Sequence, residues 1–283
     1  MSTAVAVSLS PFFLDGSNGR LFALEVAPER GDVELGILLC PPFAEELNRT
    51  RRAVQLAARR MAAQGCSVLL LDLYGTGDSE GELAQASWAG WRADLEAGAE
   101  WLSARRASRL ALWGVRLGAG LALEIAATRS CEHLLLWQPV ANGALFLNQF
   151  LRLRVAADML AADGVSSVEA LRAELTSGAS VEIAGYAITP AMAAAIDTVD
   201  LGRFANAQLP AVDWIESVAA AERPLSVASR NLIDRWQGAG QQVQPHAAVA
   251  QQFWGTPEIV VPQSFLDETE AIVRGWSRAE SPA

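Results

Sequence analysis

Residues 112–120 read LWGVRLGAG, in which Gly114 to Gly118 form the pattern Gly-x-Arg-x-Gly. An apolar strand, a tight glycine turn and a helix of small residues are the layout of a Gly-x-Ser-x-Gly turn, which exposes a serine nucleophile. Here Arg116 stands at the serine position. A guanidinium stays protonated at neutral pH and therefore does not attack a carbonyl carbon. The motif predicts either chemistry by another residue or a site that binds a ligand without reacting.

Arg116 itself has two interpretations. The helix that follows it begins with free N–H groups that favour an anion, so the arginine and the helix together predict a carboxylate or phosphate site. Alternatively, Arg116 pairs with Glu45, Glu46 or Glu258 and fills the emptied nucleophile position with an internal ion pair. Both interpretations stay open at the level of sequence.

Cys40 and Ser79 are the other candidate nucleophiles. Cys40 ends an apolar run beside the expected pocket and would react as a thiolate if Arg116 lowered its pKa, although a buried strand cysteine is more common. Ser79 lies in a Gly-Asp-Ser turn, where serine usually supports the turn through backbone hydrogen bonds. Asp72 and Asp78 belong to the same turn and are expected to pin it.

The elements that position these residues alternate between strands and helices. A hairpin is expected to turn at residues 15–19. Further strands are expected at 36–40, 66–72, 109–114, 133–140, 211–217 and 241–250, and helices at 48–63, 87–104, 117–128, 226–238 and 264–276. This alternation predicts right-handed crossovers and a mostly parallel sheet with helices on both faces, an α/β fold.

Residues 141–209 interrupt the alternation with alanine-rich sequence that lacks strong strand signals. A segment of this length is too long for a simple connection, so it predicts a helical cap inserted into a core of residues 1–140 and 210–283. Phe146, Phe150 and Leu153 are spaced as one helix face. That face is expected to form the underside of the cap or an apolar wall for an acyl ligand.

The composition limits the partners. The net charge of −10 and the sequence pI near 4.8 argue against a nucleic-acid partner, which needs a basic surface. Every fixed cation is an arginine. Three cysteines show no metal-ligand spacing, and neither a metal nor a cofactor is expected. The first residues lack the features of a signal peptide and no apolar run is long enough to span a bilayer, so we expect a cytoplasmic protein without stable membrane insertion.

Three local sequences carry a resemblance that extends over nearly the whole chain. LLCPPF (38–43), DLYGTGDSEG (72–81) and WGVRLGAG (113–120) resemble the corresponding segments of the α/β-hydrolase superfamily. More narrowly, CPPFAEELNRTRR, LWGVRLGAG and LWQPVANG resemble exosortase A system-associated hydrolases of type 2, in the serine aminopeptidase-like branch, which accompany bacterial exopolysaccharide and protein-sorting loci.

The resemblance implies hydrolysis of an ester, thioester or amide by serine, histidine and an acid, with the backbone N–H groups of Phe43 and Leu117 holding the oxyanion. The histidine is expected in residues 250–259, where Trp254 stands instead. His246 falls earlier, inside an expected strand, and His133 opens another. The acid is expected after the preceding strand, where Glu222 is the candidate, and Glu258, near Trp254, is a further catalytic candidate.

Two functions follow. One is a hydrolase of an exosortase or exopolysaccharide system that uses an unconventional nucleophile. The other is a non-catalytic relative that binds an anionic small molecule, or a partner's acidic group, in a capped pocket around Arg116. A purely structural role in a biosynthetic complex is a third expectation, for which the nine tryptophans offer anchors.

Overall fold

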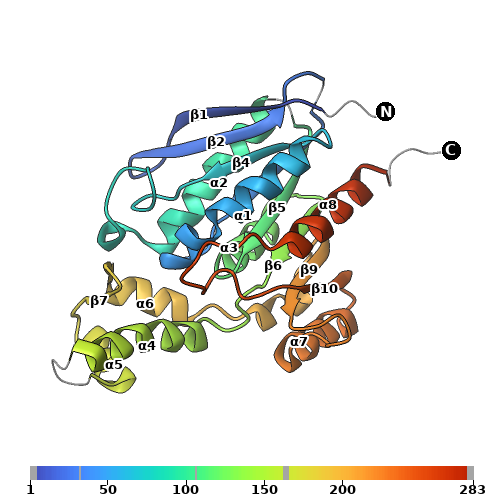
Figure 1. Ribbon diagram of the computed structural model, residues 1–283. Helices are drawn as coiled ribbons and strands as arrows, with labels where there is room; N and C mark the ends of the chain where they lie inside the picture. The colour runs from blue at the N-terminus through green and yellow to red at the C-terminus, as the bar shows by residue number, and fades with distance from the viewer. Residues whose placement is uncertain (1–4, 32, 106, 162–165, 279–283) are drawn as a thin grey trace.

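The computed structural model describes residues 5–31, 33–105, 107–161 and 166–278. Eight strands form one sheet in the order β1-β2-β4-β3-β5-β6-β9-β10 (Figure 1). They are β1 (Val7–Asp15), β2 (Arg20–Pro28), β3 (Leu35–Cys40), β4 (Ser67–Leu71), β5 (Arg109–Val115), β6 (His133–Trp137), β9 (Ala211–Val218) and β10 (Val243–Val249). β1 and β2 form the expected antiparallel hairpin, β2 is antiparallel to β4, and the remaining pairs are parallel. The predicted mostly parallel sheet is confirmed.

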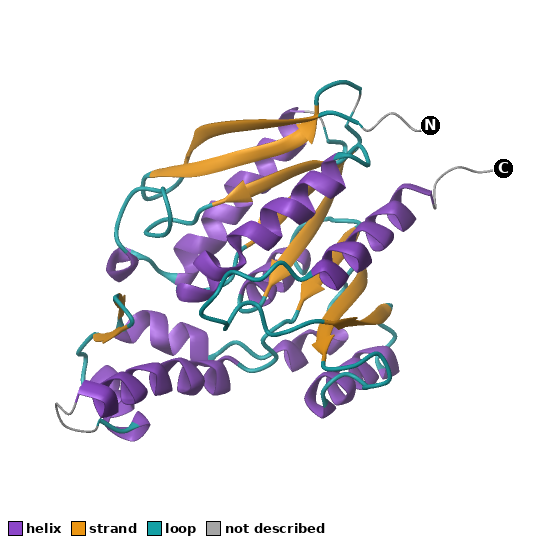
Figure 2. Ribbon diagram, in the orientation of Figure 1, coloured by secondary structure: helices purple, strands orange, loops and turns teal. Residues whose placement is uncertain are grey.

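Helices cover both faces of the sheet, as predicted (Figures 1 and 2). On one face lie α1 (Glu45–Ala62) and α8 (Gln263–Arg278), and on the other α2 (Trp88–Arg105), α3 (Gly118–Ala126) and α7 (Val227–Gly238). None of the described helices combines the length and the apolar character that a bilayer-crossing segment needs.

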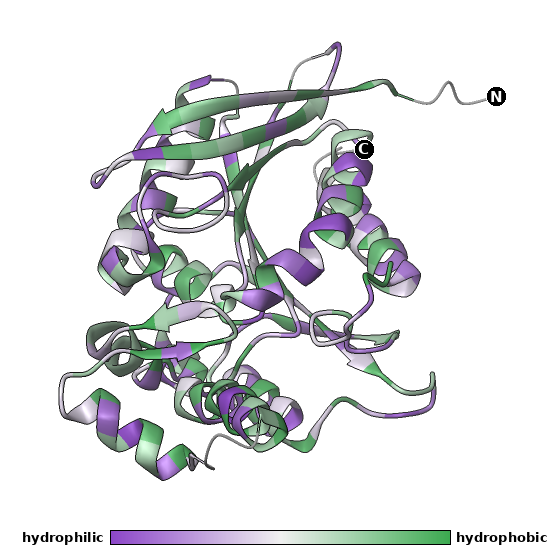
Figure 3. Ribbon diagram, turned by 60° about the vertical axis from the view of Figure 1, so that its left-hand side comes forward, coloured by the Kyte–Doolittle hydropathy of each residue, from purple (hydrophilic) through white to green (hydrophobic). Residues whose placement is uncertain are grey.

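The central strands read as continuous apolar runs because each face is buried. In β5, Leu110 and Leu112 join the core under α2 and α3, whereas Ala111 and Trp113 join the core under α1 and α8. This division follows from the two-residue period of a strand. In Figure 3 the central strands are accordingly dominated by hydrophobic colouring.

Between β6 and β9 the chain forms a separate group of elements at one end of the sheet (Figure 1). These are α4 (Gly143–Ala161), α5 (Val168–Thr176), β7 (Val181–Ile183), β8 (Tyr186–Ile188), α6 (Pro190–Asp197) and the 3-10 turn η2 (Leu201–Asn206). Residues 162–165 of this segment lie outside the described residues, as do positions 1–4 and 279–283 of the core range. The segment begins and ends at one point, where Asn142 and Asp200 form an isolated bridge.

The hairpin of β7 and β8 was not predicted from the sequence. Its two strands are only three residues long, too short for a recognisable alternation. Ala184 and Gly185 join them with φ angles of 50° and 84°, which is the geometry of a tight two-residue hairpin turn. Alanine at the first turn position concealed this signal.

Helix α1 begins at Glu45, three residues before the expected start. Ala44, just before it, has a φ of 51°, and Glu45 and Glu46 form the first turn. Carboxylates at this end interact favourably with the helix dipole. The earlier start places both glutamates at the carboxyl edge of the sheet, next to the end of β3.

The two glycines of the Gly-x-Arg-x-Gly turn are required by close packing. A Cβ atom on Gly114 would lie 2.6 Å from the Cα atom of Ala119. A Cβ atom on Gly118 would lie 2.2 Å from the carbonyl oxygen of Cys40 and 2.3 Å from that of Pro41. The start of α3 is therefore pressed against the segment that follows β3.

We predict that Gly118→Ala lowers the free energy of unfolding by about 3 kcal/mol, because backbone atoms have to move to admit the methyl group. Gly275→Ala is the matched control, since Gly275 lies in α8 and a methyl group added to it would meet no neighbouring atom within 4 Å. It should stabilise the protein by about 0.5–1 kcal/mol. Urea unfolding monitored by circular dichroism measures both values. Equal stabilities of the two variants would contradict the packing argument.

Candidate functional site

The turn at Arg116 keeps the backbone geometry of a strand-to-helix nucleophile turn. Arg116 has a φ of 55°, a conformation that is uncommon for residues other than glycine. Its N–H donates to the carbonyl of Trp137 at 2.9 Å, and its own carbonyl accepts from the N–H groups of Val140 at 3.2 Å and Ala119 at 3.1 Å. These backbone hydrogen bonds support the positive-φ conformation of Arg116.

The guanidinium of Arg116 is enclosed by three groups. Its Nε and Nη2 atoms donate to the Glu46 carboxylate at 2.9–3.2 Å. Nη1 donates to the carbonyl oxygen of Gln138 at 3.2 Å. The guanidinium carbon lies 4.8 Å from the ring centre of Trp254, within the range of a cation–π contact. Of the three glutamates considered above, Glu46 forms the ion pair.

The environment of the Glu46 carboxyl favours its protonated form more than water does. Burial raises its pKa above the ordinary value, and the charge and hydrogen bonds of Arg116 offset this only in part. The side chains of Arg116 and Glu46 are 13% and 18% exposed, so water screens the pair weakly. Loss of either partner would leave the other as a poorly solvated charge.

A cavity of about 240 Å³, the Arg116 pocket, opens beside this ion pair. Its charged lining consists of two arginines and two glutamates, Arg49, Arg116, Glu45 and Glu46. The remaining lining residues are Phe146, Gln149, Phe150, Leu153, Gln252, Trp254 and Gly255. The pocket is lined by α1, the turn after β5, helix α4 and the loop before α8. Its two arginines and two glutamates have opposite charges of equal number.

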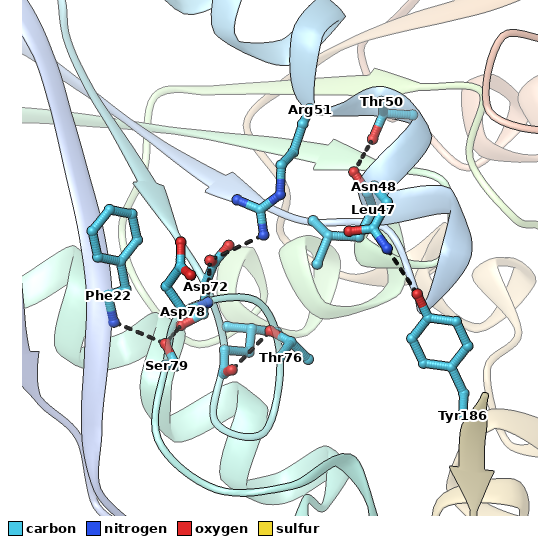
Figure 4. A network of polar contacts seen from close by, with 11 residues as sticks. Phe22, Leu47, Asn48, Thr50, Arg51, Asp72, Thr76, Asp78, Ser79 and Tyr186 are labelled. Carbon is cyan, nitrogen blue, oxygen red and sulfur yellow. Dashed lines mark hydrogen bonds and ion pairs between the residues drawn. The ribbon is translucent and has the colours of Figure 1, made fainter. Parts of the chain in front are cut away.

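Tyr186 in β8 was not identified from the sequence as a site residue. Its hydroxyl accepts from the side-chain amide of Asn48 at 2.8 Å (Figure 4). It also donates to Glu45 at 3.2 Å. Glu45 also pairs with Arg49 at 3.3 Å. These contacts attach the hairpin to the first turns of α1. Tyr186 could not be predicted as a site residue because the sequence does not predict the hairpin that carries it.

Phe43 and Leu117, the expected oxyanion residues, lie at the same place in the fold. Together with Gly118 they line a cavity of about 10 Å³, enough for roughly one water molecule. The Phe43 ring is buried in edge contacts with Trp91, 5.9 Å away, and Phe150, 5.4 Å away. The segment after β3 and the start of α3 therefore face each other as in the resemblance described above.

Cys40 and Ser79, the other candidate nucleophiles, both have structural roles: Cys40 is buried in the core and Ser79 forms hydrogen bonds to the backbone. Cys40 is fully buried, and burial raises the pKa of its thiol, with Cys131 and Glu96 adding to the effect. Arg116 does not lower it, so the condition for a thiolate nucleophile is not met. The Ser79 hydroxyl donates to the carbonyl of Asp72 at 2.6 Å and accepts from the Phe22 N–H at 2.8 Å.

The aspartates of the same turn also have structural partners (Figure 4). The Asp72 carboxylate accepts from the Asp78 N–H at 3.0 Å and from Arg51 at 3.0 Å. Asp72 is thus an anchor for the loop and for α1. Among the residues with described positions, no group of histidine, cysteine, aspartate and glutamate side chains is arranged to hold a metal ion.

Neither candidate acid lies in the Arg116 pocket. Glu222 is exposed in the turn after β9, and Glu258 is exposed in the loop before α8. Glu216, which the sequence analysis missed, is buried near the end of β9, where one carboxylate oxygen accepts from the Ser226 N–H at 2.9 Å. The two-residue period that buries Val212 and Trp214 on the same face could have identified it.

His246 and His133 also lie away from the Arg116 pocket. His246 is in β10, three strands from β5, and contacts Asp213 at 2.9 Å and Glu268 at 2.7 Å. His133 stacks on Trp276 with ring centres 4.5 Å apart. Among the described residues, neither histidine therefore forms a serine–histidine–acid arrangement at the turn that carries Arg116.

Comparison with solved structures identifies the fold type. No protein-family model and no curated protein matches the chain. The esterase Est1E from Butyrivibrio proteoclasticus, solved with bound ferulic acid, superposes with a TM-score of 0.68 at 13% identity, covering 95% of this chain and 98% of that one. XC6422 from Xanthomonas campestris, a serine hydrolase without a lid, gives 0.59 at 19% identity, covering 98% and 96%. The Pyrococcus furiosus esterase Pf2001 gives 0.63 at 13%, covering 95% and 91%. The chain has the α/β-hydrolase fold.

The contacts of His246 predict a pH dependence of stability. Burial lowers the pKa of His246, but the hydrogen bonds and charges of Asp213 and Glu268 raise it above its ordinary value of 6.5. The folded protein therefore holds this proton more tightly than the unfolded chain. The stabilisation is complete below pH 6.5 and is lost as the pH rises through the raised pKa, at up to about 1.4 kcal/mol per pH unit.

Urea unfolding of the wild type and of His246→Gln at a series of pH values measures this contribution. The difference between the two stabilities should shrink as the pH rises above 6.5. A difference that does not change with pH would contradict the assignment of a bound proton to His246.

Proposed function

We propose that this protein uses the α/β-hydrolase fold to bind a compact carboxylate ligand and does not carry out serine hydrolysis. The observation that carries the proposal is the placement of Arg116. Its guanidinium stands at the nucleophile position, at the N-terminus of α3, with Trp254 across its face. A guanidinium fork matches the two oxygens of a carboxylate.

Protonation of Glu46 is expected to favour binding of a carboxylate ligand to Arg116. In the absence of ligand it neutralises Arg116, so the four charges of the pocket cancel. An incoming carboxylate competes with Glu46 for the guanidinium, and Glu46 then takes up a proton from the solvent, which its raised pKa favours. A protonated Glu46 no longer repels the ligand and leaves Arg116 as an unmatched cation. Ligand binding should therefore be accompanied by proton uptake.

The walls favour a flat, aromatic body on the ligand. Phe146, Phe150 and Trp254 line the cavity, and its volume of about 240 Å³ is small. Aromatic rings stack on such walls at little entropic cost. Ferulic acid, the ligand in the Est1E structure, is an aromatic carboxylic acid and is a suitable probe for this chain.

The biological setting is a further part of the proposal. The segments CPPFAEELNRTRR and LWQPVANG support an association with an exosortase or exopolysaccharide system in the cytoplasm. In this proposal the residues 141–209 act as a cap, and their Phe146 and Phe150 cover the Arg116 pocket. A neighbouring exosortase gene would support the association, and a protein partner with an acidic group is an alternative occupant.

Hydrolysis of an ester, thioester or amide is the second candidate function. One observation favours it: Phe43, Leu117 and Gly118 still enclose a space large enough for about one oxygen atom at the start of α3. This is where an oxyanion would lie in a hydrolase. The reaction would need a nucleophile other than Arg116, and a water molecule activated by Glu46 is the available one.

Calorimetric titration with ferulic acid tests the binding function. We expect Arg116→Gln to weaken binding about tenfold or more, because the cation is lost. Glu46→Gln should strengthen it about threefold to tenfold at neutral pH, because it removes the internal competitor and keeps the shape. Wild-type affinity should rise as the pH falls from about 8 to about 5, and Glu46→Gln should remove this dependence. Weakening of binding by both substitutions would contradict the proposed competition.

Hydrolysis of p-nitrophenyl esters and thioesters of graded acyl length tests the second candidate. We expect no turnover above that of a mock purification, for the wild type or for Arg116→Ser, since a serine without a histidine remains weakly nucleophilic. Turnover that persists through purification and disappears in Glu46→Gln would replace the binding function with a Glu46-assisted hydrolysis.

A further inference from the structure

A second cavity, the α1 pocket, lies between α1 and strands β2, β3 and β4. It is on the face of the sheet opposite α2 and α3, since Leu39 and Val54 of its wall belong to the core under α1 and α8. Its volume of about 470 Å³ is in the range of small-molecule sites. None of its lining residues is shared with the Arg116 pocket.

The apolar lining of the α1 pocket is mostly aliphatic, with Phe22 as its one aromatic residue. Its apolar wall includes Leu24, Leu39, Leu47, Val54, Leu70 and Ile259. Leu39, Leu47 and Val54 are buried, Leu24 and Leu70 are half-buried, and Ile259 is 62% exposed. Branched aliphatic walls contact a flexible hydrocarbon chain closely, in contrast to the aromatic walls of the Arg116 pocket.

The rim of the pocket carries a net positive charge. The charged lining residues are Arg51, Arg52 and Asp72. Arg51 extends from α1 to Asp72 at 3.0 Å, so these two lining residues neutralise each other (Figure 4). Arg52 is exposed and has no ion pair within the described part of the chain. One guanidinium is thus left at the edge of an apolar cavity, in a protein whose net charge is −10.

We propose that the α1 pocket is a second ligand site, which takes an aliphatic carboxylate. The hydrocarbon chain lies between α1 and the sheet, and the carboxylate lies at the rim against Arg52. Burial of the chain supplies most of the affinity, and the guanidinium selects for the negative charge. The proposal is independent of the function assigned to the Arg116 pocket, because it uses other residues.

Calorimetric titration with octanoate, and with 1-octanol as an uncharged analogue, tests the site. We expect Leu24→Trp, which fills the cavity, to weaken binding of both compounds about tenfold or more. Arg52→Gln should weaken octanoate binding about threefold to tenfold and leave 1-octanol unaffected. Arg59→Gln is the matched control, since Arg59 is an exposed arginine of the same helix outside the pocket. It should bind both compounds as the wild type does.

Two further variants keep the result decisive. Gln55→Trp fills the cavity from a half-buried helix position, and it replaces Leu24→Trp if circular dichroism shows that the latter is unfolded. Arg116→Gln should retain octanoate binding. The proposal is overturned if octanoate fails to bind the wild type up to about 5 mM. It is also overturned if binding is lost in Arg116→Gln and kept in a folded cavity-filling variant, because octanoate would then occupy the other pocket.

Discussion

The ion pair between Arg116 and Glu46 joins four segments of the chain that are distant in sequence. Arg116 sits on the turn after β5, Glu46 on the first turn of α1, the accepting carbonyl belongs to Gln138 after β6, and Trp254 comes from the loop before α8. A buried guanidinium stays charged, so each segment has to bring a carboxylate, a carbonyl or an aromatic face to it. The start of α1 at Glu45 places Glu46 within hydrogen-bond distance of this guanidinium.

The backbone of the Gly-x-Arg-x-Gly turn is constrained by packing. Gly114 and Gly118 leave no room for a methyl group, and backbone hydrogen bonds support the positive φ of Arg116. The backbone hydrogen bonds and the glycine packing do not depend on the identity of the side chain at position 116. The glycine pattern of such a motif therefore indicates the fold, whereas the chemistry depends on the residue at its centre.

The two pockets lie on opposite sides of the first turns of α1, and their walls differ in kind. Aromatic rings and balanced charges surround Arg116, whereas aliphatic side chains and one unmatched guanidinium surround the α1 pocket. Loop residues from 252 to 259 contribute to both, through Trp254 and Ile259. A single helix thus divides two environments that suit different ligands, and its length and apolar face are set by packing against the sheet and α8.

The sequence by itself determined the alternating strands and helices, the glycine turn with Arg116 at its centre and the supporting role of Ser79, because these depend on local periodicity and on residue conformation. Only the tertiary structure decided which glutamate pairs with Arg116, where His246 lies, and that Tyr186 fastens the hairpin to α1. Glu45, Glu46 and Glu258 are equivalent as charges in a sequence. Their distances to the guanidinium depend on how separate segments pack, and electrostatic energy depends on distance and burial.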